Sequence, residues 1–172
     1  MNTTHSTVRI LIAVTALCAL GLPAHAKDAE PARATVTFET PEKFTDLKDS
    51  VTGTDKGREY YLKLIRNRVA EVAGQSLPAG QQLEMTFTDI DLAGDYLPAM
   101  ASGHDIRVMK DVYMPRMAFT FKITDADGAV VKEGTETIRD LNYLSTVGIV
   151  GRNDALFYDL AMLSDWLRKN LK

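Results

Sequence analysis

Hydrophobic and polar residues alternate along four stretches of the chain, and this period of two predicts half-buried β-strands. The four stretches cover residues 34–39, 83–88, 117–124 and 130–138. Residues 105–113 predict a further short strand, whereas residues 95–104 predict an irregular loop. The turn sequence Asp125-Ala126-Asp127-Gly128 makes the last two long strands a hairpin.

Two positions within the predicted strands indicate irregular pairing. The apolar positions of the second strand move from odd numbers to Ile90 and Leu92, which predicts a bulge or a strand end before them. Gly134 lies inside the second strand of the hairpin and predicts another bulge, because glycine within a strand often marks one.

Apolar residues recur at helical spacing in two other segments. Residues 55–75 carry one continuous apolar stripe. The C-terminal segment, residues 156–171, carries leucines three or four positions apart, and Asn153 or Asp154 is its expected N-cap. Both segments predict amphipathic helices with one face turned to a core.

Strands with one apolar face and helices with one apolar stripe predict a two-layer α+β domain. We expect a mainly antiparallel sheet of four to five strands, with one helix after the first strand and one at the C-terminus, both packed on the same face. This single domain is expected to cover residues 34–172, preceded by a flexible, charged lead-in at residues 27–33.

The N-terminus predicts an export signal. A polar start with one positive charge, Arg9, is followed by an apolar run over residues 10–22 and by the cleavage pattern Ala24-His25-Ala26. The apolar run is shorter than the roughly 20 residues that a membrane-spanning helix needs. We therefore expect residues 1–26 to be removed near Ala26, leaving a periplasmic or secreted protein without a transmembrane segment.

Composition narrows the possible functions. The 172 residues contain 20 Lys and Arg against 23 Asp and Glu, which argues against nucleic-acid binding. The single cysteine, Cys18, and two of the three histidines lie in the predicted signal. The exported chain would keep only His104 and no thiol or disulfide, so we expect its stability to come from packing and its function from binding.

Short polar and aromatic motifs occur along nearly the whole predicted domain. They are Phe44-Thr45-Asp46, Asp89-Ile90-Asp91-Leu92-Ala93-Gly94, Pro115-Arg116, Asp125-Ala126-Asp127-Gly128, Asp140-Leu141-Asn142-Tyr143 and Leu163-Ser164-Asp165-Trp166-Leu167. In this order they resemble the exported bacterial family called domain of unknown function 3016, and the six-residue motif from Asp89 is the most specific part. The resemblance implies an exported, envelope-located protein and implies no activity, cofactor or partner.

Three aspartates are candidates for a metal site. Asp89, Asp91 and Asp95 follow one another at a strand end, and carboxylates on one face can share a hard cation such as calcium. The spacing departs from an EF-hand loop, because Ala93 stands where that loop has a ligand. The alternative is that the three carboxylates face solvent or accept local hydrogen bonds.

Ser102, His104 and Asp105 place a hydroxyl, an imidazole and a carboxylate within four residues. A nucleophilic triad needs the imidazole to reach the hydroxyl while the carboxylate orients its other nitrogen, which neighbouring loop residues seldom achieve. A serine hydrolase is therefore the least favoured alternative.

Arg107 and Arg116 belong to the one locally basic stretch and are candidates for holding an anionic ligand or partner. The other interpretation of this stretch is a solvated sheet edge with ion pairs to nearby acids. Tyr143 is a candidate groove residue. We expect a non-enzymatic domain without a cofactor that binds an envelope protein or a small ligand through Asp89, Asp91, Arg107, Arg116 and Tyr143, because binding groups gather at strand ends and loops.

Overall fold

The computed structural model describes residues 33–47, 55–97, 106–145 and 156–172. These residues belong to a compact unit formed by residues 31–172. The predicted signal peptide lies outside the described residues, and so do Ser102, His104, Asn153 and Asp154.

The described residues form strands, two α-helices and two short 3-10 helices. In chain order they are β1 (Ala34–Phe38), η1 (Pro41–Lys43), α1 (Asp55–Ser76), β2 (Gln82–Asp91), β3 (Asp95–Leu97), β4 (Ile106–Val108), β5 (Arg116–Thr124), β6 (Val130–Arg139), η2 (Tyr143–Ser145) and α2 (Phe157–Asn170). The long predicted strands, the hairpin and both helices are thereby confirmed.

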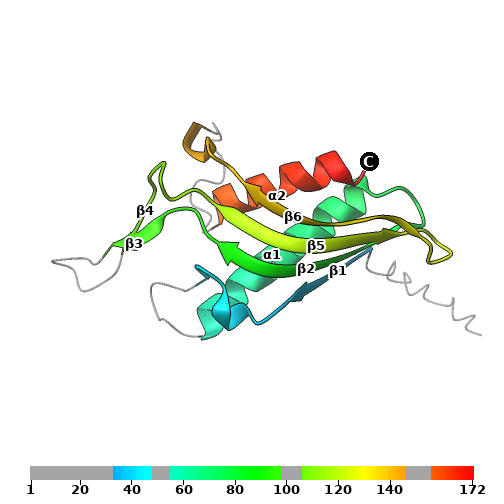
Figure 1. The fold of residues 1–172 in the computed structure, drawn as a ribbon, viewed down its shortest axis with the longest axis horizontal. Coiled ribbons are helices and arrows are strands. Elements are labelled where there is room, and N and C mark those ends of the chain that lie inside the picture. Colours follow the sequence, from blue (N-terminus) through cyan, green and yellow to red (C-terminus); the bar gives the residue numbers. More distant parts are fainter. Residues whose placement is uncertain (1–32, 48–54, 98–105, 146–155) are drawn as a thin grey trace, which may run out of the picture. The chain divides into compact units, whose positions relative to one another are not determined.

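Four strands form the main sheet, in the order β1-β2-β5-β6. β5 is antiparallel to both of its neighbours, whereas β1 and β2 are parallel. The parallel pair follows from α1, because a helix between two strands can return the chain to the end at which the first strand began. The separate pair β3 and β4 is antiparallel and lies beyond the end of β2 (Figure 1).

Both helices cover the same face of the main sheet, which confirms the predicted α+β fold (Figure 1). The core between the layers joins the apolar stripes of α1 and α2 to the inward-facing residues of β2 and β5. Trp166 of α2 meets Phe119 and Phe121 of β5 edge to face, with ring centroids 4.8 Å and 5.0 Å apart. Such aromatic contacts fix α2 over the centre of the sheet.

The opposite face of the sheet is polar. Thr37, Thr86, Thr120 and Thr135 are paired in register and form a row across all four strands. Antiparallel sheets commonly expose one face in this way, while the alternate residues fill the core. The candidate site lies on this polar face, at the end of the sheet where β2 and β6 stop and β5 begins.

The sequence predicted one bulge correctly and one wrongly. The pairing of β2 with β5 shifts between Phe87 and Asp89, where the apolar positions change parity. Gly134, by contrast, pairs regularly with Phe121, and the shift in β6 lies between Lys132 and Val130. A Cβ at residue 134 would lie 3.1 Å from the Phe121 ring, so the missing side chain of Gly134 lets this ring approach the strand closely.

Two further predictions need correction. Residues 95–97 are not part of a loop, because they form β3 and pair with β4. The C-terminal helix begins at Phe157, and its N-cap is Leu156, without a side-chain hydrogen bond. The predicted caps, Asn153 and Asp154, lie outside the described residues, three or more positions before that start.

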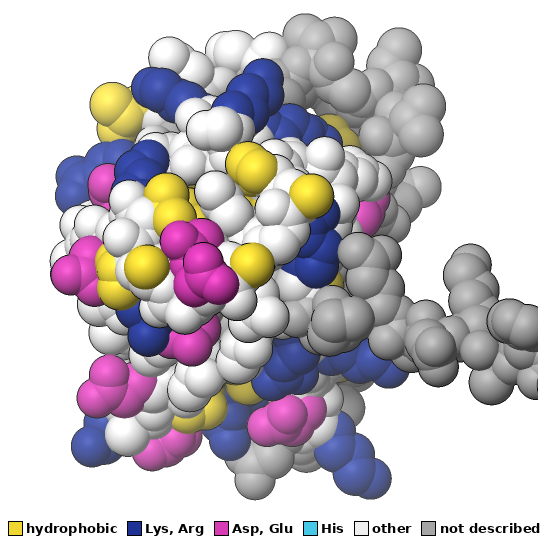
Figure 2. Space-filling view, turned by 90° about the vertical axis from the view of Figure 1, so that its right-hand side faces the viewer, with side chains coloured by type: hydrophobic (Ala, Val, Ile, Leu, Met, Phe, Trp, Pro, Cys, Tyr) yellow, Lys and Arg dark blue, Asp and Glu magenta, His cyan; other side chains and the backbone are white. Residues whose placement is uncertain are grey.

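Charges of both signs are mixed on the end of the molecule that carries the turn between β5 and β6. Figure 2 shows acidic and basic side chains next to one another there, with apolar side chains only in small patches. No helix among the described residues is both long and apolar enough to span a membrane.

Candidate functional site

A row of four charged residues crosses the end of the sheet. Asp46, in the segment after η1, forms a parallel bridge with Asp91, Asp91 pairs with Arg116 of β5, and Arg116 pairs with Arg139 of β6. We call these four residues the charged row. Because paired residues on neighbouring strands share a face, the register places two acids beside two arginines.

A cavity of about 460 Å³ lies against the charged row. We call it the site cavity. Its lining comes from the charged row, from the turn after β2 and from the segment before β5: Thr45, Asp46, Asp91, Leu92, Gly94, Asp95, Val112, Tyr113, Met114, Arg116 and Arg139. The volume falls within the usual range of small-molecule sites, roughly 300–1,000 Å³.

Asp89 holds two segments together. Its carboxylate accepts hydrogen bonds from the Thr45 backbone N–H at 2.8 Å and from the Thr45 hydroxyl at 2.9 Å, and it forms an ion pair with Arg116 at 2.6 Å. Burial raises the pKa of Asp89, but the hydrogen bonds from Thr45 and the contact with Arg116 outweigh burial, so that the pKa lies below its ordinary value. The carboxylate is therefore a structural anion that joins β2 to β5 and to the segment after η1.

Asp91 has the same chemistry but fewer partners. Its carboxylate lies 3.8 Å from Arg116 Nε, outside hydrogen-bond distance, and its side chain is 35% exposed. Burial is the largest influence and raises its pKa above the ordinary value, although the charge of Arg116 opposes this. Asp91 thus faces the site cavity as an anion whose charge is only partly compensated.

Arg107 fixes the turn after β2 by binding its backbone carbonyls. Its guanidinium donates hydrogen bonds to the backbone carbonyls of Ala93 at 2.9 Å and Gly94 at 3.0 Å, and it pairs with Asp46 at 2.7 Å. Only 13% of the Arg107 side chain is exposed. A planar guanidinium can serve several acceptors in fixed directions, so this residue shapes the site cavity without lining it.

Gly94 ends the six-residue motif in a left-handed conformation, with φ of 80°. A Cβ at this position would lie 2.9 Å from the Val108 backbone oxygen and 3.1 Å from Arg107 Cγ. The Gly94 N–H donates to the Tyr113 carbonyl at 2.9 Å, which brings the segment before β5 over the turn. Glycine is required here both by the backbone angle and by the close approach of β4.

We predict that Gly94→Ala lowers the free energy of unfolding by about 2 kcal/mol, because it adds a steric clash to an unfavourable backbone angle. Gly128→Ala is the matched control: Gly128 has φ of 82°, and a Cβ there would meet nothing within 4 Å. The control should lose only about 1 kcal/mol in urea denaturation. Equal losses of unfolding free energy in the two variants would show that the close approach at Gly94 does not contribute to the cost of the substitution.

Asp159 supports the turn from the helix layer. This residue of α2 is 2% exposed, and its carboxylate accepts the Ala93 N–H at 2.9 Å. Burial raises the pKa of Asp159 to about 6, although the hydrogen bonds from backbone N–H groups and the charge of Arg107 act in the opposite direction. Asp159 therefore connects α2 to the same turn whose carbonyls Arg107 binds.

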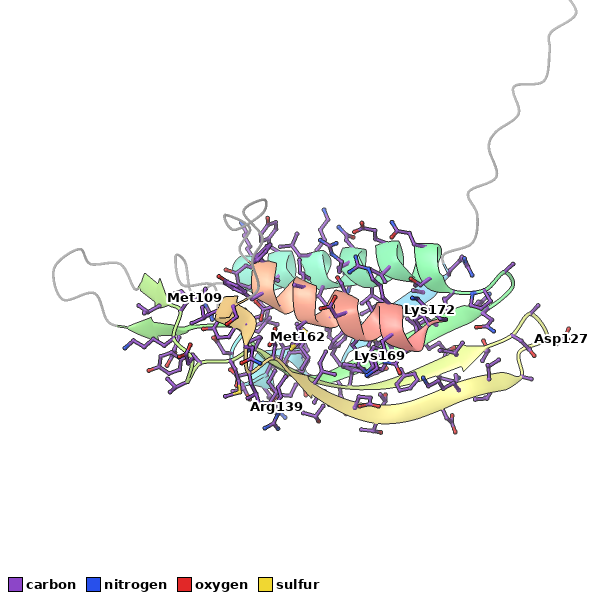
Figure 3. The ribbon with its side chains drawn as sticks, turned by 90° about the horizontal axis from the view of Figure 1, so that it is seen from above. Met109, Asp127, Arg139, Met162, Lys169 and Lys172 are labelled. Carbon is purple, nitrogen blue, oxygen red and sulfur yellow. The ribbon has the colours of Figure 1, made fainter. Side chains whose placement is uncertain are left out.

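Arg139 is the last residue of β6, at the opposite end of that strand from the turn with Asp127 (Figure 3). Its side chain is exposed and lines the site cavity. No hydrogen bond or ion pair of its guanidinium is found with the described residues. Of the two arginines in the charged row, Arg116 is neutralised by Asp89, whereas Arg139 keeps its charge for solvent or a ligand.

The predicted site residues separate into three groups. Asp91 and Arg116 line the site cavity, Asp89 and Arg107 hold its walls, and Tyr143 is placed elsewhere. Tyr143 is 1% exposed and donates its hydroxyl to the Lys110 carbonyl at 2.8 Å, so it does not lie in an open groove.

The metal alternative finds little support in the described residues. Asp95 lines the site cavity, but Asp89 is engaged by Thr45 and Arg116. No group of three or more His, Cys, Asp or Glu side chains that could hold a metal ion occurs in the part of the chain that the structure describes. Ser102 and His104, the hydrolase candidates, fall in residues 98–105, outside that part.

Sequence reasoning missed several residues of the site. Thr45 and Asp46 carried a signal, because they belong to one of the motifs noted above, but nothing in the sequence pairs them with Asp89 or Arg107. Arg139 and Asp159 carried no such signal in the sequence, because each is one charged residue in an amphipathic segment. Their roles follow from contacts between residues far apart in the chain.

Comparisons with known proteins give a family and no function. The family model described as "Protein of unknown function (DUF3016)" matches residues 32–169. No curated protein matches the chain. Among solved structures, a dodecamer of a PelC variant from Paraburkholderia phytofirmans is similar at 14% sequence identity over 77% of this chain and 86% of that chain, with a TM-score of 0.27, which is too low to support an inference about this protein.

Proposed function

Because this chain belongs to the DUF3016 family of proteins of unknown function, we propose a function from its own site: the domain binds a small polar ligand in the site cavity without converting it. Asp91 and Arg139 contact the ligand. Asp46, Thr45, Asp89 and Arg107, which we call the frame residues, hold together the segments that form the wall of the cavity around Asp91.

One observation carries this proposal: two opposite charges, each incompletely compensated, flank a cavity of ligand size. Asp91 has one arginine at 3.8 Å, and Arg139 has no partner among the described residues, whereas the frame residues form contacts of 2.6–2.9 Å. Protein side chains normally satisfy buried or half-buried charges. Asp91 is such a half-buried charge, whereas Arg139 is exposed and has no partner among the described residues; a cavity lined by both is suited to a ligand that supplies their partners.

Binding is favoured over catalysis by the state of the hydroxyl–carboxylate pair that Thr45 and Asp89 form beside the site cavity. The Thr45 hydroxyl donates to Asp89 at 2.9 Å, a geometry that a nucleophile and a base would share. The contacts with Thr45 and Arg116 lower the pKa of Asp89 despite burial, and a carboxylate with a lowered pKa is a poor proton acceptor. The pair therefore serves the fold.

The test is a chemical-shift map of the isotope-labelled chain with a library of polar small molecules that includes amines, carboxylates, zwitterions and sugars. We expect at least one compound to shift the amide signals of residues that line the site cavity, and Asp91→Asn and Arg139→Gln each to weaken that binding by roughly 5- to 10-fold. Asp165→Asn and Arg168→Gln, on the exposed face of α2, are the matched controls and should leave it unchanged. If no compound shifts the lining amides, the proposal is wrong.

We further propose that this binding takes place outside the cytoplasm, after removal of residues 1–26. The support is the order of charge, apolar run and small-residue cleavage pattern at the N-terminus. Mass spectrometry of the protein from a periplasmic extract should find a chain that begins at Lys27. An intact chain that begins at Met1 and stays in the cytoplasm would contradict this.

A further inference from the structure

We propose that the ligand of the site cavity is dipolar: a short peptide of two or three residues, with its free amino group at Asp91 and its free carboxylate at Arg139. This inference rests on the proposed function and specifies its ligand class. It comes from the order of charges in the register of the sheet.

The charged row has a direction. Across the sheet it reads acid, acid, arginine, arginine, from Asp46 through Asp91 and Arg116 to Arg139. Two of these charges, one of each sign, are compensated within the protein, because Asp46 pairs with Arg107 and Arg116 pairs with Asp89. Within the charged row, what remains toward the cavity is one anion on β2 and one cation on β6, with the neutralised Arg116 between them.

The spacing of these two groups matches a short peptide. Asp91 and Arg139 are two strands apart, and neighbouring strands lie about 4.8 Å apart, so their backbones are separated by roughly 10 Å. An extended peptide spans about 3.5 Å per residue, so three residues reach about 10 Å. Two residues also suffice, since an arginine side chain is long and flexible.

The wall between the two charges fits the uncharged middle of such a ligand. Arg116 already donates to Asp89 and to the Thr45 hydroxyl, and so presents a polar surface with little net charge. Val112, which is 71% exposed, and Tyr113 add apolar surface to the same cavity. A ligand with one charge would satisfy Asp91 or Arg139 and leave the other group unmatched, whereas a dipolar ligand satisfies both.

The probe is trialanine, because its side chains carry no charge and each of its ends can be capped separately. Four forms are titrated into the purified chain by calorimetry and followed by chemical-shift mapping: free, N-acetylated, C-amidated, and capped at both ends. We expect each single cap to weaken binding by roughly 5- to 10-fold and the double cap to abolish it within the measured range.

Each variant is titrated with each of the four forms of trialanine, so that the loss of a charge on the protein can be compared with the loss of a charge on the peptide. Asp91→Asn should weaken binding of free trialanine but make no further difference to the N-acetylated form, because the charge it would meet is already gone. Arg139→Gln should behave in the same way toward the C-amidated form. Asp165→Asn and Arg168→Gln, which lie on α2, should leave all four affinities unchanged.

Each result separates this inference from the proposed function. If capping makes no difference, or if trialanine does not bind while another library compound shifts the lining amides, the short-peptide ligand is wrong and the binding site stands. If neither trialanine nor any library compound shifts the lining amides, both are wrong. Crossed losses of the expected kind support both.

Discussion

We expect the replacement of Arg107 by glutamine to lower the free energy of unfolding by about 3 kcal/mol. The guanidinium is 13% exposed and bonds two carbonyls of the turn after β2 together with the Asp46 carboxylate. The Asp46 side chain is only 18% exposed. Removing the guanidinium leaves the Asp46 carboxylate without its ion-pair partner. Breaking a largely buried ion pair from one side costs about 3–5 kcal/mol.

Urea denaturation of two further variants controls this result. Arg168 is also an arginine in an ion pair, but its side chain is 52% exposed, and Arg168→Gln should change stability by less than about 0.5 kcal/mol. Arg107→Lys should recover only part of the loss, because an ammonium group cannot serve carbonyls and a carboxylate in the fixed directions of a guanidinium. An Arg107→Gln variant as stable as Arg168→Gln would show that the turn is held by other contacts.

We expect the replacement of Asp159 by asparagine to change how stability depends on pH. The pKa of Asp159 is raised by burial from 3.8 to about 6, so between these values the folded state binds a proton that the unfolded state has released. This residue therefore makes the wild-type protein progressively less stable as the pH rises through this window. Well below the lower of these two pKa values the contribution stays constant, since the group is protonated in both states.

Asparagine cannot ionise, and its carbonyl can still accept the Ala93 N–H. The stability of Asp159→Asn relative to wild type should therefore rise by about 2–3 kcal/mol between pH 4 and pH 7.5. Thermal unfolding of both proteins across this range measures the difference directly. Asp89 acts with the opposite sign, because its pKa lies below its ordinary value, but it is present in both proteins and cancels. Parallel stability curves would contradict the assignment of this titration to Asp159.

The fold was largely predictable because its determinants are local. Alternation defined β2, β5 and β6, and even the parity change before Ile90 matched the shift in pairing at Phe87 and Asp89. Gly134 was misinterpreted because a glycine can mark either a bulge or a close contact, and only the position of the Phe121 ring distinguishes them. β3 was missed because a three-residue strand is too short to show a period.

The site was predictable only in part, because its geometry is not local. The pattern selected Asp89, Asp91 and Arg116 but gave the two aspartates the same role. Their roles differ because the bulge and the register bring Thr45 to Asp89 and leave Asp91 facing the cavity. Asp159 reaches the turn from α2, and no spacing along the chain encodes that contact.

The central claim is that these two carboxylates, two residues apart on one strand, have different functions: Asp89 maintains the fold and Asp91 meets the ligand. The most direct measurement is the free energy of unfolding of Asp89→Asn and Asp91→Asn in urea at neutral pH. We predict that Asp89→Asn loses about 1–2 kcal/mol, because its contacts with Thr45 and Arg116 weaken, whereas Asp91→Asn stays within about 0.5 kcal/mol of wild type. Equal losses in the two variants would contradict the claim.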